Sequence, residues 1–146
     1  MTEPQEWAAA LKNLPHGPEF RFLDRLLHLE PGRQGAGEYR LRGDEPFLRG
    51  HFPGKPLFPG VLLVEAAAQL AGVVAQCDPQ LGPLPGLKLT ALRSVKILGT
   101  ATPGESIRLD ARIIGRMGNL VQAEAAASCQ GRTLMEASLT LAGDPT

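Results

Sequence analysis

Two residues of this 146-residue chain can exchange protons and stand fourteen positions apart, His51 and Glu65. His51 lies in residues 50–60, a stretch with too much proline and glycine to form a helix. Glu65 follows in a segment that is otherwise rich in Val, Leu and Ala. Histidine ordinarily has a pKa of about 6.5, and burial raises the pKa of a carboxyl group. The pair therefore suits a general base and a general acid that act on an apolar substrate.

A helix is expected over residues 61–76, and it must carry Glu65. Its polar residues are spaced by four, three and four positions, which places them on one narrow stripe of a helix: Glu65, Gln69, Gly72 and Gln76. The rest of the segment is almost entirely Val, Leu and Ala. A helix that is apolar nearly all round is surrounded by protein rather than laid on a surface.

Alternating or apolar segments between glycine and proline turns predict the remaining elements. In residues 37–42, Tyr39 and Leu41 share one face and charged residues the other. Residues 122–127 are rich in alanine, which favours helix, but the glycine turns on both sides indicate a strand. We expect a short helix at residues 6–14 and strands at residues 20–29, 37–42, 87–98, 105–113, 120–129 and 133–141.

These elements predict one α+β domain over residues 1–146, in which a long antiparallel sheet curves around the central hydrophobic helix. This is the hotdog fold. A single sheet has open edges and leaves one end of the helix exposed, so we expect a homodimer at least, with a trimer of dimers left open. The side chains expected to face inward from the last strands are Ile107, Leu109, Ala111, Ile113, Met135, Ala137, Leu139 and Leu141.

Composition narrows the class of protein. Lys+Arg and Asp+Glu both number 15, so no net charge favours nucleic acid or an anionic membrane. Cys77 and Cys129 lack metal-type or redox-type spacing and are expected to be free thiols in a reducing cytosol. The N-terminus has no secretory pattern, and Glu65 interrupts the longest apolar stretch, residues 57–75. We expect a cytoplasmic protein with no metal or other cofactor, no membrane span and no nucleic-acid partner.

Residues 50–69 resemble the signature of the FabZ-type beta-hydroxyacyl-acyl-carrier-protein dehydratases. The shared elements are Gly-His-Phe-Pro-Gly-Lys-Pro, then Pro-Gly-Val-Leu, then Glu-Ala-x-Ala-Gln. Weaker similarity is found at residues 14–16, 23–25, 44–47 and 103–105. The resemblance implies that His51 takes the proton from C2 of a (3R)-hydroxyacyl thioester and that Glu65 protonates the departing 3-hydroxyl. The products are a trans-2-enoyl thioester and water, and the implied partner is an acyl carrier protein in fatty-acid or related biosynthesis.

Other residues are expected to bind the substrate. Gly60 and Val61 begin the helix, where free N–H groups and the positive end of the helix dipole can hold the thioester oxygen as charge develops. The resemblance also places the glycine at position 60 in this region. Gln69 lies one turn beyond Glu65 and could orient the carboxyl group or simply complete a polar network. The expected walls of an acyl tunnel are Phe52, Leu57, Phe58 and Leu62.

The chain departs from the FabZ pattern in residues 17–22 and 89–101, which in the family line the tunnel or the dimer contacts. The dehydratase–isomerase relatives carry Asp where Glu65 stands, which argues against isomerisation. His16 and His28 have no evident chemical partners and are expected to be structural or solvent-facing. A basic set could be a solvated face or a docking patch for an acidic carrier protein, and its members are Arg40, Arg42, Arg49 and Lys55.

Alternatives to the dehydratase remain open from the sequence. A hotdog thioesterase would use a helix carboxylate to activate water and would not need His51. A specialised dehydratase of a polyene or polyketide pathway, or a non-catalytic acyl-binding partner, would keep the fold. Glu65 could also be a structural residue, paired with Arg or Lys.

Overall fold

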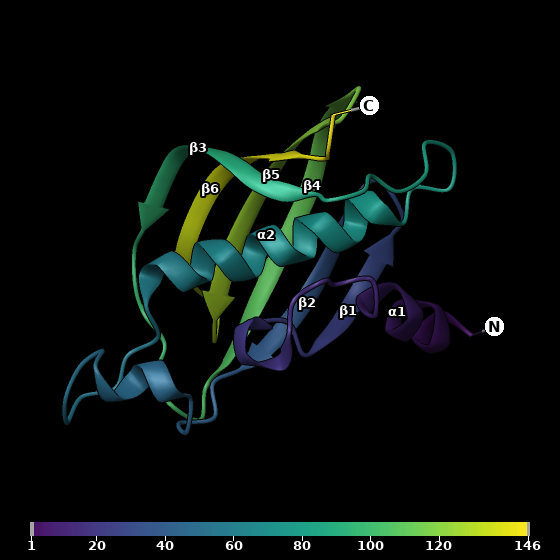
Figure 1. The fold of residues 1–146 in the computed structure, drawn as a ribbon. Helices are drawn as coiled ribbons and strands as arrows, with labels where there is room; N and C mark the ends of the chain where they lie inside the picture. Colours follow the sequence, from purple (N-terminus) through teal and green to yellow (C-terminus); the bar gives the residue numbers. More distant parts are fainter. Residues whose placement is uncertain (1, 146) are drawn as a thin grey trace.

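The computed structural model describes residues 2–145, which form a six-stranded antiparallel sheet curled around one long helix (Figure 1). The strand order is β1-β2-β4-β5-β6-β3. This arrangement is the α+β hotdog fold expected from the sequence. The elements are α1 (Glu3–Leu11), the 3-10 turn η1 (Pro18–Phe20), β1 (Arg25–Glu30), β2 (Gln34–Arg40), the 3-10 turn η2 (Pro46–Arg49), α2 (Gly60–Gln76), β3 (Lys88–Ile97), β4 (Ser106–Met117), β5 (Leu120–Cys129) and β6 (Arg132–Ala142).

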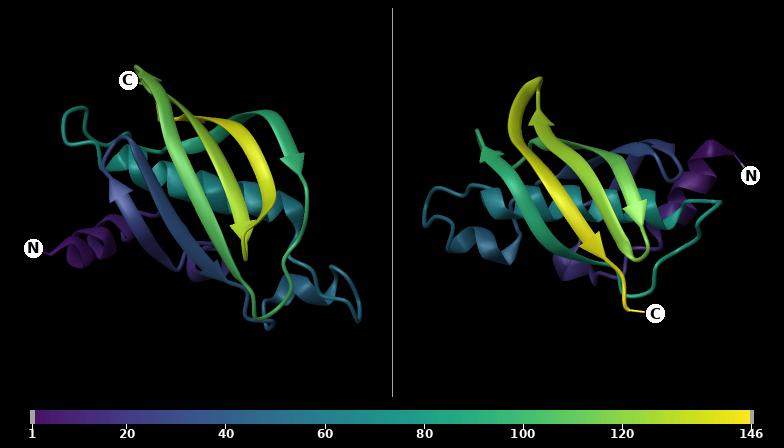
Figure 2. Two further views of the ribbon diagram at one scale, coloured as in Figure 1. Left: turned by 180° about the vertical axis from the view of Figure 1, so that it is seen from behind. Right: turned by 90° about the horizontal axis from the view of Figure 1, so that it is seen from above.

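Helix α2 lies across the concave face of the sheet, and its apolar residues make the core with the inner side chains of the strands (Figure 2). Leu63 and Leu70 are fully buried, as are Ile107 and Leu109 of β4. The predicted inward set of β6 is confirmed, since Met135, Ala137, Leu139 and Leu141 are all buried. In the predicted set of β4 only Ile113 is partly exposed.

The alanine-rich segment is a strand, as expected. Within β5, Ala125 pairs with Ala111 of β4 on one side and with Ala137 of β6 on the other. All three of these small side chains are buried. Tertiary packing therefore outweighs the helix propensity of alanine here.

The first strand begins later than expected. Residues 20–29 were predicted to be extended throughout, but β1 starts at Arg25, after the turn Pro18–Phe20. The cause lies in α2, because the backbone N–H of Phe22 donates to Oε1 of Gln69 over 2.9 Å instead of to a neighbouring strand. The segment around Phe22 is thus attached to the helix, and bonding to β2 begins only at Asp24, whose N–H donates to the carbonyl of Glu38 over 2.8 Å.

Strand β3 is an edge strand that pairs only with β6. Nearly all of its residues are exposed, including Leu92, Val95 and Ile97, and Leu98 beyond it is 58% exposed. Such an edge is open to pairing with another strand.

No helix within residues 2–145 combines the length and apolar character needed to cross a membrane.

Candidate active site

His51 lies in a closed loop between η2 and α2. Within the loop, Phe52 and Lys55 exchange two backbone hydrogen bonds of 3.0 and 2.8 Å, and the N–H of Leu57 donates to the carbonyl oxygen of His51 over 2.9 Å. Gly54 has a positive φ of 73°, which a side chain would oppose at this tight turn. The ring of His51 stacks on Phe52 with 4.1 Å between centroids. The histidine is therefore held by its own loop.

The protonation pattern of the His51 ring follows from one contact. Its Nδ1 lies 2.9 Å from the carbonyl oxygen of Leu57. A carbonyl oxygen only accepts hydrogen bonds, so Nδ1 carries the proton and the lone pair of the neutral ring is on Nε2. Within residues 2–145, no side chain or backbone group makes a hydrogen bond to Nε2. The free nitrogen is the one that can accept a proton.

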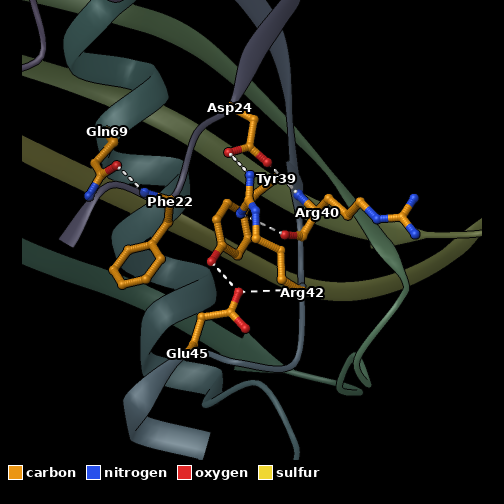
Figure 3. A network of polar contacts seen from close by, with 7 residues as sticks. All are labelled: Phe22, Asp24, Tyr39, Arg40, Arg42, Glu45 and Gln69. Carbon is orange, nitrogen blue, oxygen red and sulfur yellow. Dashed lines mark hydrogen bonds and ion pairs between the residues drawn. The ribbon is translucent and has the colours of Figure 1, made fainter. Parts of the chain in front are cut away.

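A polar network anchors the chain that leads into this loop (Figure 3). The Glu45 carboxylate accepts hydrogen bonds from the hydroxyl of Tyr39 (2.6 Å) and from the backbone N–H groups of Arg42 (3.0 Å) and Gly43 (2.7 Å). Burial raises the pKa of Glu45, but these hydrogen bonds outweigh it, so that the pKa lies below its ordinary value. Arg42 in turn pairs with Asp24 over 2.9 Å. The turn between β2 and η2 is thereby fixed.

Helix α2 starts at Gly60 without a side-chain cap. The N–H groups of Leu62 and Leu63 bond to the carbonyl of Pro59, whereas those of Gly60 and Val61 have no partner in the described part of the chain. A Cβ on Gly60 would come within 2.8 Å of Cγ2 of Ile97. Glycine therefore lets Ile97 pack directly against the helix start where β3 ends, and two free donors remain there.

The predicted tunnel residues lie in different surroundings. Phe52 is 49% exposed, beside His51. Phe58 is only 1% exposed and packs against the rings of Phe22, Tyr39 and Phe47. Its backbone binds residues 100–101, with its N–H donating to Ala101 (2.9 Å) and its carbonyl accepting from the Thr100 hydroxyl (3.1 Å). The divergent segment 89–101 thus fixes the chain between the histidine loop and α2.

Gln69 both completes a network and contacts the carboxyl group of Glu65. It is 2% exposed. Its Oε1 accepts from the N–H of Phe22 (Figure 3), and its Nε2 donates to the carbonyl of Phe20 over 2.8 Å and to Oε2 of Glu65 over 3.1 Å. Both N–H donors and the oxygen of the amide are engaged, so these bonds hold Gln69 toward Glu65.

His16 also lies at Glu65, contrary to the expectation from the sequence. Its Nε2 is 3.4 Å from Oε2 of Glu65, and the two side chains are 28% and 22% exposed. The partner of the carboxylate is thus a histidine and not the Arg or Lys considered as a structural alternative. His28, by contrast, is exposed and makes a T-shaped ring contact with Trp7. The weak motif match at residues 14–16 was the only signal in the sequence for His16.

Glu65 opens onto a cavity of about 880 Å³ between α2, the N-terminal segment and the start of β3. The predicted polar stripe of the helix lines it, which confirms that stripe as one continuous face. At its far end the Gln76 amide bonds both backbone groups of Leu84, accepting from N–H over 2.6 Å and donating to the carbonyl over 2.7 Å. His51 does not line this cavity, so a single chain does not bring the two predicted catalytic residues into one pocket. The lining includes Leu14, Phe20, Ala68, Leu87, Leu89 and Leu141.

Comparisons to known proteins show the family to which the sequence belongs. A family model described as the FabA-like domain matches residues 14–138. The 3-hydroxyacyl-acyl-carrier-protein dehydratase FabZ of Acetivibrio thermocellus is 35% identical over 130 residues, which cover 88% of each chain. The FabZ of Chloroflexus aggregans is 33% identical and covers 91% of this chain and 92% of its own.

Solved structures support the fold alone. A chain of the dehydratase heterocomplex ApeI:P from Xenorhabdus doucetiae superimposes with a TM-score of 0.78 at 18% identity, covering 96% of this chain and 92% of that chain. A hypothetical thioesterase from Streptococcus pneumoniae, solved with coenzyme A, has a TM-score of 0.63 at 11% identity and covers 83% and 85%. The structure therefore defines a hotdog-fold protein. By sequence, the chain belongs to the FabA-like dehydratase family, with FabZ enzymes among its relatives.

Proposed function

We propose that this protein dehydrates (3R)-hydroxyacyl thioesters carried on an acyl carrier protein, in fatty-acid or related acyl-chain biosynthesis. The observation that carries the proposal is the 2.9 Å contact between Nδ1 of His51 and the Leu57 carbonyl. It fixes the ring as a base with Nε2 free, which removal of a proton from C2 requires. The relatives of the chain bear the name of this activity.

In this mechanism Nε2 of His51 takes the C2 proton, and the electron pair moves to form the C2–C3 double bond. Glu65 gives its proton to the 3-hydroxyl as the C3–O bond breaks, and water leaves. Negative charge develops on the thioester oxygen while C2 loses its proton. The free N–H groups of Gly60 and Val61 are suited to stabilise it, since they point outward from the positive end of the helix.

The cavity beside Glu65 is assigned to the acyl chain. It follows α2 from Glu65 toward Gln76, a rise of about 16 Å for eleven helical residues. Its lining is mostly apolar, with the polar stripe of α2 along one side. Phe52, Leu57 and Leu62 remain proposed walls on the side of the histidine loop, whereas Phe58 is buried in the aromatic cluster behind them.

The active unit is proposed to be a homodimer in which His51 of one protomer faces Glu65 of the other. Two features support this. The cavity that Glu65 lines lacks His51, and the exposed edge of β3 carries Leu92, Val95 and Ile97 toward solvent. Pairing through this edge would also cover Val61, which is 71% exposed. A trimer of dimers is compatible with the same pairing.

A carrier protein is the proposed source of the substrate. Arg49 and Lys55 flank His51, are exposed and form no ion pair with any described residue, whereas Arg42 is engaged with Asp24. Free cations beside the site entrance suit an acidic carrier. The proposed location is the cytoplasm, where such carriers are made.

One assay tests this function directly. The purified protein is incubated with (3R)-hydroxyacyl thioesters of several chain lengths, on acyl carrier protein and on coenzyme A. Enoyl absorbance and the loss of one water by mass spectrometry report dehydration, while a thiol reagent reports hydrolysis. Enoyl formation without thiol release is expected. Thiol release alone would identify a thioesterase, and neither reaction on any substrate would favour a non-catalytic acyl-binding protein.

A further inference from the structure

The carboxyl group of Glu65 is approached by two nitrogen donors on one side only. Nε2 of Gln69 lies 3.1 Å and Nε2 of His16 lies 3.4 Å from the same oxygen, Oε2. Among the residues that the structure describes, none makes a hydrogen bond to the other oxygen, Oε1. The two oxygens of this carboxyl group are therefore not equivalent.

The neutral ring of His16 has a single N–H hydrogen-bond donor, on either Nδ1 or Nε2. Its Nδ1 is buried and has no hydrogen-bond partner in the described chain, so the neutral ring with its proton on Nε2 is the form that these surroundings support. The ring stacks near Phe20 at 6.3 Å between centroids, and the backbone carbonyl of His16 accepts from Arg21. These contacts aim Nε2 at the carboxyl group.

We infer that His16 is a positioning residue that decides which oxygen of Glu65 carries the catalytic proton. Oε2 accepts a hydrogen bond from Gln69 and faces Nε2 of His16 at 3.4 Å, so an acid proton on this oxygen would crowd both nitrogens. The proton is therefore on Oε1. When it passes to the 3-hydroxyl, the hydrogen bond from Gln69 remains on Oε2, and Nε2 of His16 is close enough to stabilise the carboxylate that forms.

This inference rests on the proposed dehydration, in which Glu65 is the acid. The other charged group lining the cavity is Lys88, and it is directed toward Asp144 at 3.8 Å and the carbonyl of Gly86 at 3.1 Å. His16 and Gln69 are thus the donors that act on Glu65.

A pair of amide variants separates the donor from the ring. In His16→Gln the side-chain nitrogen can reach the position of Nε2, whereas in His16→Asn it reaches only the position of Nδ1. We expect His16→Gln to stay within about threefold of the wild-type kcat and His16→Asn to lose about tenfold, with KM nearly unchanged in both. The matched control is His28→Asn, which alters a histidine that does not contact Glu65 and should leave kcat unchanged. Thermal unfolding by circular dichroism checks that each variant is folded.

A spectroscopic measurement tests the inference without any substrate. The infrared difference between wild type and Glu65→Gln isolates the C=O stretch of the protonated carboxyl group at neutral pH. Loss of a donor on Oε2 should move this band to higher frequency in His16→Asn and not in His16→Gln.

Equal kcat values for the two amide variants would overturn the inference, whether both were active or both inactive. So would the absence of a protonated carboxyl band, because His16 and Glu65 would then form a simple ion pair. If the wild type dehydrates nothing but the band shifts as described, the proposed function fails while the positioning by His16 stands.

Discussion

The hydroxyl of Tyr39, at the end of β2, donates a 2.6 Å hydrogen bond to Oε2 of Glu45, just before η2. This bond spans the turn after which the chain enters the His51 loop. Burial and the neighbouring Glu45 carboxylate raise the pKa of Tyr39 far above its ordinary value of 10.0, so the phenol stays a neutral donor at any ordinary pH. The base of the histidine loop is therefore fixed by a bond to a charged acceptor.

Tyr39→Phe should lower the free energy of unfolding by about 1–2 kcal/mol near neutral pH, because the bond to a partly exposed carboxylate is lost. The pKa of Glu45 lies below its ordinary value of 4.5, so its contribution is present above pH 4.5 and disappears as pH falls through the native pKa. The difference between wild type and variant should therefore shrink in acid. Urea unfolding at several pH values measures it, and a difference that grew toward low pH would contradict the assignment.

His51→Ala and Glu65→Gln should each lower turnover by about a hundredfold or more, the usual effect of removing a general base or acid. His51→Asn is a sharper variant, since its amide can keep the contact with the Leu57 carbonyl while lacking Nε2. It should be as inactive as His51→Ala but unfold at nearly the wild-type temperature. Controls are His28→Ala and Glu124→Gln, the latter an exposed carboxylate paired with Arg112. Near-normal turnover of a site variant would remove that residue from the mechanism.

Mixing inactive His51→Ala and Glu65→Gln proteins should restore activity if the site is shared between protomers. A hybrid dimer then has one site with both lesions and one with neither. Random exchange makes about half of the dimers hybrid, so recovery should approach roughly a quarter of the wild-type rate for independent sites. Native mass spectrometry confirms the exchange. Exchange without recovered activity would place both residues in one chain.

Gly72→Leu should shorten the acyl chains that the enzyme accepts. Gly72 lines the cavity about 10 Å along the helix from Glu65, and only Leu87 Cδ2, at 3.9 Å, lies within 4 Å of a Cβ built there. A leucine should obstruct the cavity and reduce kcat/KM for 3-hydroxydodecanoyl relative to 3-hydroxybutyryl thioesters by about tenfold or more. Gly72→Ala is the matched control and should leave this ratio unchanged. An unchanged ratio in both variants would place the acyl chain elsewhere.

The sequence predicted the parts of the fold that depend on a regular period. The expected helix over residues 61–76 differs from α2 by one residue, and the expected strand over residues 120–129 coincides with β5. The polar stripe of α2 lines one cavity because its spacing follows the helical turn. Each of these results comes from a pattern that is local in the chain.

Contacts between distant segments were not predictable in this way. The extended residues before β1 look like a strand, yet they bind the amide of Gln69, which lies 47 residues beyond Phe22. His16 is separated from Glu65 by the same kind of distance in the sequence. A single sequence gives no periodic signal for a side chain that meets its partner only after the chain has folded.

The two hydrogen bonds between Gln76 and Leu84 set the free energy needed to open the far end of the cavity. Two such bonds contribute about 1–3 kcal/mol to holding the loop 83–86 against the helix. A ligand too long for the closed cavity could displace that loop at this cost, which corresponds to a discrimination of roughly 5- to 150-fold. Activity should then decline gradually with each carbon added beyond the length of the closed cavity, instead of ending abruptly at one chain length.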